Sequence, residues 1–393
     1  MNILYHHRTQ GTGAEGVHIS QIIKGLRGLG NNVSVVCPSG DDPLKTAGNN
    51  PFAKKKGGLK KKILSFVSSH LPQALFECLE MAYNFSAYPK IKNIVEIEKV
   101  ELIYERYAFL MTAGARIAKE RKTPFIVEVN EIAGHKRVRK QVFVRKARDA
   151  EYLIFTQAEA IIVVSSFLKQ EIVDLGIDAQ KIFVISNGAD DVLFDPAKYD
   201  RKKQRALYSL GDKDIVFGFI GWFVPWHNLE FFIKVFSKID NENCKLILVG
   251  DGGLKDSLYI LTETLNIADK VIFAGAIPYE KIPDMINALD ICIIPDSNEY
   301  RSPIKMFEYM AMGKPVVAPN YEPIRSVIDD GKDGVIFDPM DKENLVRILN
   351  NVVNDEGKRK ILGNNAREKI LKQHLWKHNA QKVLEIYRKV TAQ

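Results

Sequence analysis

The stretch RSPIKMFEYMAMGKPVVAPN at residues 301–320 predicts a helix followed by a short buried strand. Ser302 is suited to the N-cap, Pro303 to the first helical position and Gly313 to the helix end. Lys305 then falls in the first turn, where a cation opposes the helix dipole at a cost of roughly 0.3–1 kcal/mol. An anion bound between this lysine and the free backbone N–H groups would remove the conflict.

Glu308 lies three residues after Lys305, so the two side chains share one helix face. A carboxylate one turn below a bound phosphate can accept hydrogen bonds from both hydroxyls of a ribose. The pair therefore predicts a site for a nucleoside diphosphate. The alternative is an ordinary Glu–Lys surface pair, worth roughly 0.2–0.5 kcal/mol.

Short apolar runs alternate with amphipathic segments along the chain, which is typical of parallel α/β units. The expected strands are residues 2–6, 33–37, 102–106, 125–129, 160–164, 182–186, 216–221, 245–250, 271–275, 291–295, 315–319 and 334–337. About half lie on each side of the polar stretch 187–204, which favours two doubly wound domains. We expect one domain at 1–193, completed by 375–393, and a second at 194–374.

The composition describes a soluble globular protein with a substantial core: 393 residues, 46% hydrophobic and 26% charged. No apolar run approaches the roughly 20 residues of a membrane span, and the N-terminal apolar run is too short for a secretory leader. The four cysteines are far apart, without a CxxC pair, and are expected to be reduced and mostly buried. A cytoplasmic location follows as an expectation.

The net charge of +8 is concentrated in two basic stretches, residues 54–62 and 135–151. Such stretches can contact an anionic membrane or phosphorylated ligands, or simply form a solvated face. Nucleic acid is not favoured, because aromatic residues do not interleave with the basic ones. The apolar segment 63–83 fits either a membrane-surface helix or a core helix.

The segment SPIKMFEYMAMGKPVVA resembles the signature helix of glycosyltransferase family 4, which comprises retaining, nucleotide-sugar-dependent enzymes of the GT-B fold. Further segments resemble this family in order along the chain: 11–19, 158–196, 219–236, 246–258, 271–300 and 375–387. The resemblance implies an α/β, GT-B architecture with two Rossmann-like domains facing across a cleft. It also implies a C-terminal helix that crosses back to the N-terminal domain.

The resemblance implies functional residues in both domains. Lys305 would stabilise the leaving diphosphate, and Glu308 would hold the ribose. The other implied donor-binding residues are Ser302, Pro303, Ile304, Arg301, Tyr300, Glu299, Gly221, Trp222, Ile277 and Gly250, with the base near Ile277. The implied acceptor and phosphate loop contains Gly11, Thr12, Gly13, Glu15 and Gly16.

The sequence departs from the family pattern in three respects. The acid that usually binds the donor sugar, eight residues before the helix glutamate, is replaced by Tyr300, with Glu299 just before it. The usual Arg and Lys after the first strand of the second domain are Trp222 and His227. Asn130 stands where a histidine often follows the fourth strand of the first domain. We expect Asn130 to position ligand, and His227 either to contact phosphate or to be structural.

The resemblance implies transfer of a sugar from a nucleotide diphosphate, UDP before GDP, to a glycan or lipid-linked acceptor in surface polysaccharide synthesis. No cofactor and no metal are expected, because no DxD pair stands at a strand end. The basic stretches and the segment 63–83 suggest a cytoplasmic enzyme that binds peripherally to the inner face of the cell membrane. A non-catalytic subunit and a nucleotide-sugar epimerase remain alternatives. The GxGxxG pattern of Gly11, Gly13 and Gly16 also suggests a dinucleotide enzyme, but the expected acid after the next strand is missing.

Overall fold

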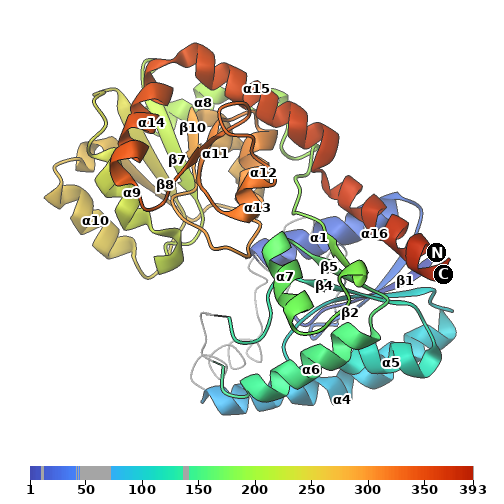
Figure 1. Cartoon of the computed structure of the whole chain (residues 1–393). Helices are drawn as coiled ribbons and strands as arrows, with labels where there is room; N and C mark the ends of the chain where they lie inside the picture. The colour runs from blue at the N-terminus through green and yellow to red at the C-terminus, as the bar shows by residue number, and fades with distance from the viewer. Residues whose placement is uncertain (10–12, 41, 43, 45–71, 136–140, 393) are drawn as a thin grey trace. The chain divides into compact units, whose positions relative to one another are not determined.

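The computed structural model describes the chain except for residues 10–12, 41, 43, 45–71, 136–140 and 393. It forms two compact units, Met1–Ser186 with Trp376–Gln393, and Asn187–Leu375 (Figure 1). The second unit begins before the boundary expected after residue 193. The reason is that the backbone and side chain of Asn187 both hydrogen bond to Ser302 within the second unit.

The first unit contains a six-stranded parallel sheet in the order β2-β1-β3-β4-β5-β6. The strands are β1 (Asn2–His6), β2 (Asn32–Val36), β3 (Leu102–Arg106), β4 (Phe125–Val129), β5 (Ala160–Val163) and β6 (Ile182–Val184). The helices are α1 (Gly13–Gly28), α4 (Gln73–Ile97), α5 (Ala113–Arg121), α6 (Val144–Gln157), α7 (Ser166–Asp174), the 3-10 turn η1 (Ala179–Lys181) and α16 (Trp376–Thr391). The strand order changes direction between β1 and β3, which is where such sheets bind ligands.

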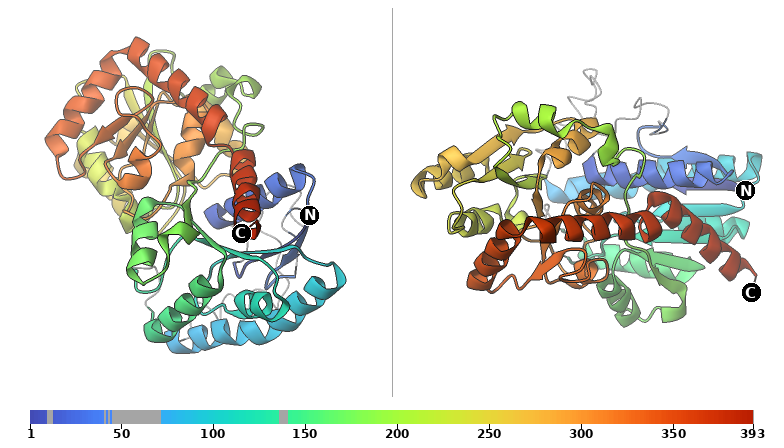
Figure 2. Two further views of the ribbon diagram at one scale, coloured as in Figure 1. Left: turned by 45° about the vertical axis from the view of Figure 1, so that its right-hand side comes forward. Right: turned by 90° about the horizontal axis from the view of Figure 1, so that it is seen from above.

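The last helix, α16, packs against α1 in the core of the first unit (Figure 2). A Cβ at Gly25 in α1 would lie 2.8 Å from the Cβ of Ala380 and 3.2 Å from the carbonyl oxygen of Trp376. Glycine is therefore needed where the two helices meet. Through this contact the end of the chain becomes part of the first unit's core.

The second unit contains another six-stranded parallel sheet, in the order β12-β11-β10-β7-β8-β9. Its strands are β7 (Ile215–Ile220), β8 (Cys244–Val249), β9 (Val271–Gly275), β10 (Ile291–Ile293), β11 (Val316–Pro319) and β12 (Val335–Phe337). Its order changes direction between β7 and β10. The carboxyl ends of these two strands therefore open the crevice where an α/β sheet binds its ligand.

The helices of the second unit cover both faces of its sheet. They are α8 (Arg201–Ala206), α9 (Leu229–Phe236), α10 (Lys255–Thr264), α11 (Ile282–Ala288), α12 (Ile304–Ala311), α13 (Glu322–Arg325), α14 (Lys342–Asn354) and α15 (Glu356–Gln373). The 3-10 turns are η2 (Pro196–Lys198), η3 (Pro225–His227), η4 (Ala268–Lys270) and η5 (Tyr279–Lys281). Every strand expected from the sequence is present in the two sheets. The predicted doubly wound α/β architecture is thus confirmed.

Among the described residues the cysteines form no disulfide, and all except Cys78 are buried, as expected. Within the ranges that the structure describes, no helix is both long and apolar enough to cross a membrane. The expected membrane-surface or core segment 63–83 lies partly outside the described residues. Its second part forms the start of α4, where Leu75 and Leu79 are exposed and Glu77 is buried.

Candidate functional site

The helix predicted from the opening stretch is α12, and its start differs from the prediction by one position. The N-cap is Pro303, whose carbonyl accepts a hydrogen bond from the N–H of Met306, and Ile304 is the first helical residue. Ser302 is not the N-cap, because it is held by Asn187: its Oγ accepts from the Asn187 N–H at 3.2 Å and its carbonyl from Asn187 Nδ2 at 2.6 Å. The first turn of α12 thus has no side-chain cap, and its N–H groups are available to an anion.

Lys305 lies in the first turn of α12, as predicted, and three neighbours explain how a lysine is accommodated there. Its Nζ is 4.1 Å from the centroid of the Phe219 ring, a cation–π contact, and 3.4 Å from Nε2 of His227. Burial lowers the pKa of Lys305 to about 7, although the nearby Glu308 carboxylate acts in the opposite direction. The amine is therefore ready to become fully charged when an anion binds.

His227, at the end of η3, is held as a neutral imidazole. Its Nδ1 lies 2.7 Å from the carbonyl oxygen of Trp222, so Nδ1 carries the proton and donates a hydrogen bond to that oxygen. Nε2 then presents a lone pair to Lys305. Burial, followed by the charge of Lys305, lowers the pKa of His227 to about 3. This arrangement favours a hydrogen-bonding role for His227 over proton transfer near neutral pH, while the Trp222 side chain itself is 69% exposed.

Two glycines allow close packing of the backbone beside Lys305: Gly221 lies next to its amine, and Gly250 lies next to Gly221. A Cβ on Gly221, just after β7, would lie 2.5 Å from Nζ of Lys305, and the residue has φ +156°. A Cβ on Gly250, just after β8, would lie 1.9 Å from the carbonyl oxygen of Gly221, and its φ is +144°. Both positions, predicted as donor-binding residues, therefore require glycine for a steric and a conformational reason.

Glu308 lies one turn below Lys305 and is almost fully buried, with 7% of its surface exposed. Its Oε1 accepts a hydrogen bond from the hydroxyl of Tyr279 at 2.7 Å. Burial raises the pKa of Glu308 to about 7, although Tyr279 and Lys305 both favour the ionised form. Tyr279 was not identified from the sequence; its place two residues after Ile277, which was expected near the base, is the signal that could have found it.

The loop between β10 and α12 contains the residues expected near the donor sugar. Glu299 is exposed, whereas Tyr300 is buried with 9% of its surface accessible. The guanidinium of Arg301 lies 5.5 Å from the centroid of the Tyr300 ring and 5.8 Å from that of Trp226. Arg301 is thus oriented by two aromatic rings, and Glu299 is the more accessible of the two candidates for the missing sugar-binding acid.

Asp296 is a second acid in this loop that sequence reasoning missed. Its Oδ1 accepts a hydrogen bond from the hydroxyl of Tyr321 at 3.1 Å, and its Oδ2 accepts from Nδ2 of Asn228 at 3.3 Å. Asn228 directly follows His227. The carboxylate therefore ties the loop after β10 to the turn after β7, at the two strands where the sheet order reverses.

In the first unit, Asn130 follows β4 and is tied to a buried ionic cluster. Its Nδ2 donates a hydrogen bond to Oε1 of Glu128 at 2.9 Å. The same Oε1 accepts from Nη1 of Arg106 at 2.5 Å and lies 2.8 Å from Nε2 of His18. Tyr104 donates to the other carboxylate oxygen at 2.8 Å. Burial opposes ionisation of Glu128, but His18 and Arg106 outweigh it and hold its pKa well below the usual range. The signal that could have predicted this cluster is the presence of charged residues inside the apolar runs LIYER (102–106) and FIVEV (125–129).

The glycine-rich stretch is described only in part, because Gly11 and Thr12 lie outside the described residues. Gly13 begins α1 with φ +66°, a left-handed conformation that favours glycine. Glu15 is exposed in the first turn of α1, and Gly16 is buried. Gly13, Glu15, Gly16 and Asn130 belong to the first unit, whereas Lys305, Glu308, Gly221, Gly250 and His227 are gathered in the second. Among the described residues, no group of three or more His, Cys, Asp or Glu is placed to hold a metal ion.

Comparison with known proteins places both halves in one group of enzymes. A family model described as Glycosyltransferase Family 4 matches residues 15–192, and one described as Glycosyl transferases group 1 matches residues 200–369. Among solved structures, HepE of Anabaena in complex with UDP superposes with a TM-score of 0.74 at 19% identity, covering 99% of this chain and 100% of that chain.

Two named relatives align with only part of this chain. The uncharacterized glycosyltransferase MJ1607 of Methanocaldococcus jannaschii is 26% identical over 61% of this chain and 62% of its own. The alpha-D-kanosaminyltransferase of Streptomyces kanamyceticus is 25% identical over 42% of this chain and 43% of its own. The chain thus spans less than two thirds of either relative. With both halves matched by family models and the fold shared over the full length, the chain belongs to glycosyltransferase family 4 and has the GT-B fold.

Proposed function

We propose that this protein is a retaining glycosyltransferase that moves a sugar from a nucleotide-sugar donor to an acceptor. UDP is the first candidate for the donor nucleotide, and GDP is the second. The observation that carries the proposal is the grouping of Lys305, Gly221 and His227 at the uncapped start of α12, with Glu308 one turn below. This grouping offers one cation, free N–H groups and one carboxylate at the spacing of a diphosphate and a ribose. HepE, which shares the fold, was solved with UDP, and this supports UDP as the first choice.

The proposed chemistry is mainly electrostatic. As the bond between sugar and phosphate breaks, negative charge grows on the departing diphosphate, and preorganised donors at that position lower the barrier. Lys305, charged when the diphosphate is present, and the N–H groups of α12 supply those donors. The acceptor hydroxyl attacks the same face of the sugar, and an oxygen of the departing phosphate takes its proton. No metal is needed in this scheme, because the protein supplies the positive charge.

Calorimetric titration with UDP and GDP tests the donor site. We expect wild type to bind one of them and the Lys305→Met and Glu308→Ala variants to bind it at least about 10-fold more weakly, since each loses a charge-assisted hydrogen bond. Lys234→Met is the matched control, because Lys234 is exposed on α9 and forms an ion pair with Glu230 on the same helix. Absence of binding by folded wild type would refute the proposal.

Turnover separates the alternatives to a transferase. If the protein is a transferase, the rate of donor hydrolysis or sugar transfer should depend on which acceptor is added. Donor conversion without any acceptor would instead indicate an epimerase. Tight nucleotide binding with no donor conversion, given membrane and glycan extracts as acceptor sources, would indicate a non-catalytic subunit.

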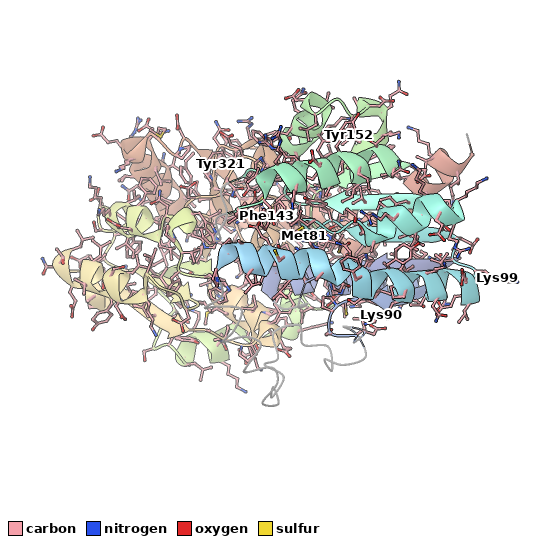
Figure 3. All side chains as sticks on the ribbon, turned by 90° about the horizontal axis from the view of Figure 1, so that it is seen from below. Met81, Lys90, Lys99, Phe143, Tyr152 and Tyr321 are labelled. Atoms are coloured by element: carbon pink, nitrogen blue, oxygen red, sulfur yellow. The ribbon has the colours of Figure 1, made fainter. Side chains whose placement is uncertain are left out.

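We also propose that the acceptor is lipid-linked, belongs to surface polysaccharide synthesis, and is met at an anionic inner membrane surface. The support comes from α4 and α6, which run along one side of the first unit (Figure 3). Leu75, Leu79 and Phe85 on α4 are 49%, 53% and 84% exposed. Glu77 near the start of α4 accepts hydrogen bonds from the backbone N–H groups of Val142 and Phe143. The start of α6, which carries Arg145 and Lys146, therefore lies beside the start of α4.

Vesicle binding tests the membrane proposal. We expect sedimentation with vesicles that contain phosphatidylglycerol, and a loss of binding when the lysines of residues 54–62, which lie outside the described residues, are changed to glutamate. Phe85→Ser should weaken binding further, whereas the exposed Ile260→Ser in α10 should not. Equal binding of all variants would refute this part of the proposal.

A further inference from the structure

Tyr279 occupies a distinctive place in the proposed donor site. It begins η5, four residues after Gly275, the last residue of β9, and its side chain is 6% exposed. Its hydroxyl donates to Oε1 of Glu308 at 2.7 Å, across 29 positions of sequence. Among the described residues, no other group donates to the carboxylate of Glu308, so Oε2 remains for a ligand.

We propose that Tyr279 is a positioning residue that orients the Glu308 carboxylate toward the ribose hydroxyls and so makes the site prefer ribonucleotides over deoxyribonucleotides. The inference rests on the proposed function, because it assumes that Glu308 faces a ribose. A carboxylate fixed at one oxygen by a buried phenol can rotate little about its last torsion. The second oxygen is then aimed in one direction, as a preorganised acceptor must be.

The ring of Tyr279 is itself held by an aromatic contact. It packs edge-to-face on Phe194, with 5.9 Å between ring centroids, and Phe194 is fully buried. The carbonyl of Phe194 accepts from Arg367, which also donates to the carbonyl of Ala311 at the end of α12. One frame therefore holds both Tyr279 and the helix that carries Glu308, which fixes their relative position.

The titratable groups that face this pair come from several elements. Lys305 and Tyr309 lie on α12 with Glu308, and Asp190 from the start of the second unit acts on Tyr279. Burial raises the pKa of Glu308 to about 7, and the hydrogen bond from Tyr279 lowers it. Removing the hydroxyl removes that contribution, so the carboxylate should ionise at a higher pH in Tyr279→Phe.

The test measures the affinity of UDP and 2′-deoxyUDP by calorimetry at pH values from 6 to about 9, a range that brackets the usual shifts of a buried carboxyl. We expect wild type to prefer UDP by about 10-fold, the contribution of one hydrogen bond to a charged group. Tyr279→Phe should bind UDP more weakly, bind 2′-deoxyUDP nearly as wild type does, and lose most of the preference. As pH is lowered, the affinity of Tyr279→Phe for UDP should also begin to fall at a higher pH than that of wild type. Ionisation of UDP is common to both proteins and cancels.

Controls separate positioning from structural damage. Tyr259→Phe changes an exposed tyrosine on α10 and should behave as wild type. Glu308→Gln should lose the preference as Tyr279→Phe does. An equal loss of affinity for both nucleotides in Tyr279→Phe, or an unchanged preference and pH profile, would overturn the inference. Failure of wild type to bind either UDP or GDP would instead refute the proposed function.

Discussion

Nζ of Lys305 lies 3.4 Å from Nε2 of His227, although the two residues are 78 positions apart in sequence. Nδ1–H of His227 donates a hydrogen bond to the carbonyl of Trp222, so the lone pair on Nε2 faces the amine. His227, at a position where the sequence comparison expected a cation, therefore faces Lys305 as an acceptor. The positive charge next to it is carried by Lys305 on α12.

This geometry predicts that His227 stays neutral over the working pH range. Because burial and the neighbouring charge of Lys305 lower its pKa to about 3, its imidazole should not titrate between about pH 5 and 8, where an unperturbed histidine does. Long-range ¹H–¹⁵N spectra, assigned with His227→Ala, should show an Nδ1-protonated tautomer throughout. A midpoint near neutral pH would contradict the assignment.

Gly221→Ala should weaken nucleotide binding and destabilise the second unit. The new Cβ would lie 2.5 Å from Nζ of Lys305, on a backbone with φ +156° that disfavours alanine. We expect a loss of about 1–3 kcal/mol in the free energy of unfolding, measured by urea denaturation. Gly253→Ala is the matched control, since a Cβ there meets nothing within 4 Å, and the two variants should differ clearly.

Glu308→Gln should lose nucleotide affinity but stabilise the free protein at alkaline pH. Burial raises the pKa of Glu308 from 4.5 to about 7, so between these values the folded state binds more protons than the unfolded state. Wild-type stability therefore falls as pH rises through this window, by about 3 kcal/mol in total. The variant lacks this loss, so its advantage in thermal midpoint should be larger at pH 8 than at pH 5. A constant difference at both pH values would show that the carboxyl of Glu308 titrates normally.

Glu128→Ala should destabilise the first unit by about 3–5 kcal/mol, because it leaves the buried guanidinium of Arg106 without its partner. The double variant with Arg106→Met should recover much of the loss, since the buried guanidinium that Glu128 compensated is then absent as well. Glu230→Ala removes one partner of an exposed pair and should change the free energy of unfolding by under about 0.5 kcal/mol. Equal single and double losses would mean that packing, not charge, dominates at this position.

Much of the fold was predictable because its signals are local. The alternation of apolar runs with amphipathic segments identified the strands of both sheets, and the lysine in the first turn of 301–320 pointed to an anion site. The start of α12 was misplaced by one residue. Whether Ser302 caps the helix depends on Asn187, a residue 115 positions away whose place no local pattern predicts.

The strands, the two α/β units and the first-turn placement of Lys305 follow from local patterns, because periodicity and helix geometry act over a few residues. The side-chain partners follow instead from the folded arrangement: Tyr279 for Glu308, the lone pair of His227 for Lys305, and Arg106 for Glu128. Each partnership joins residues from different elements. Its geometry, and the pKa shifts that burial produces, exist only once the strand order has brought the carboxyl ends of separate strands together.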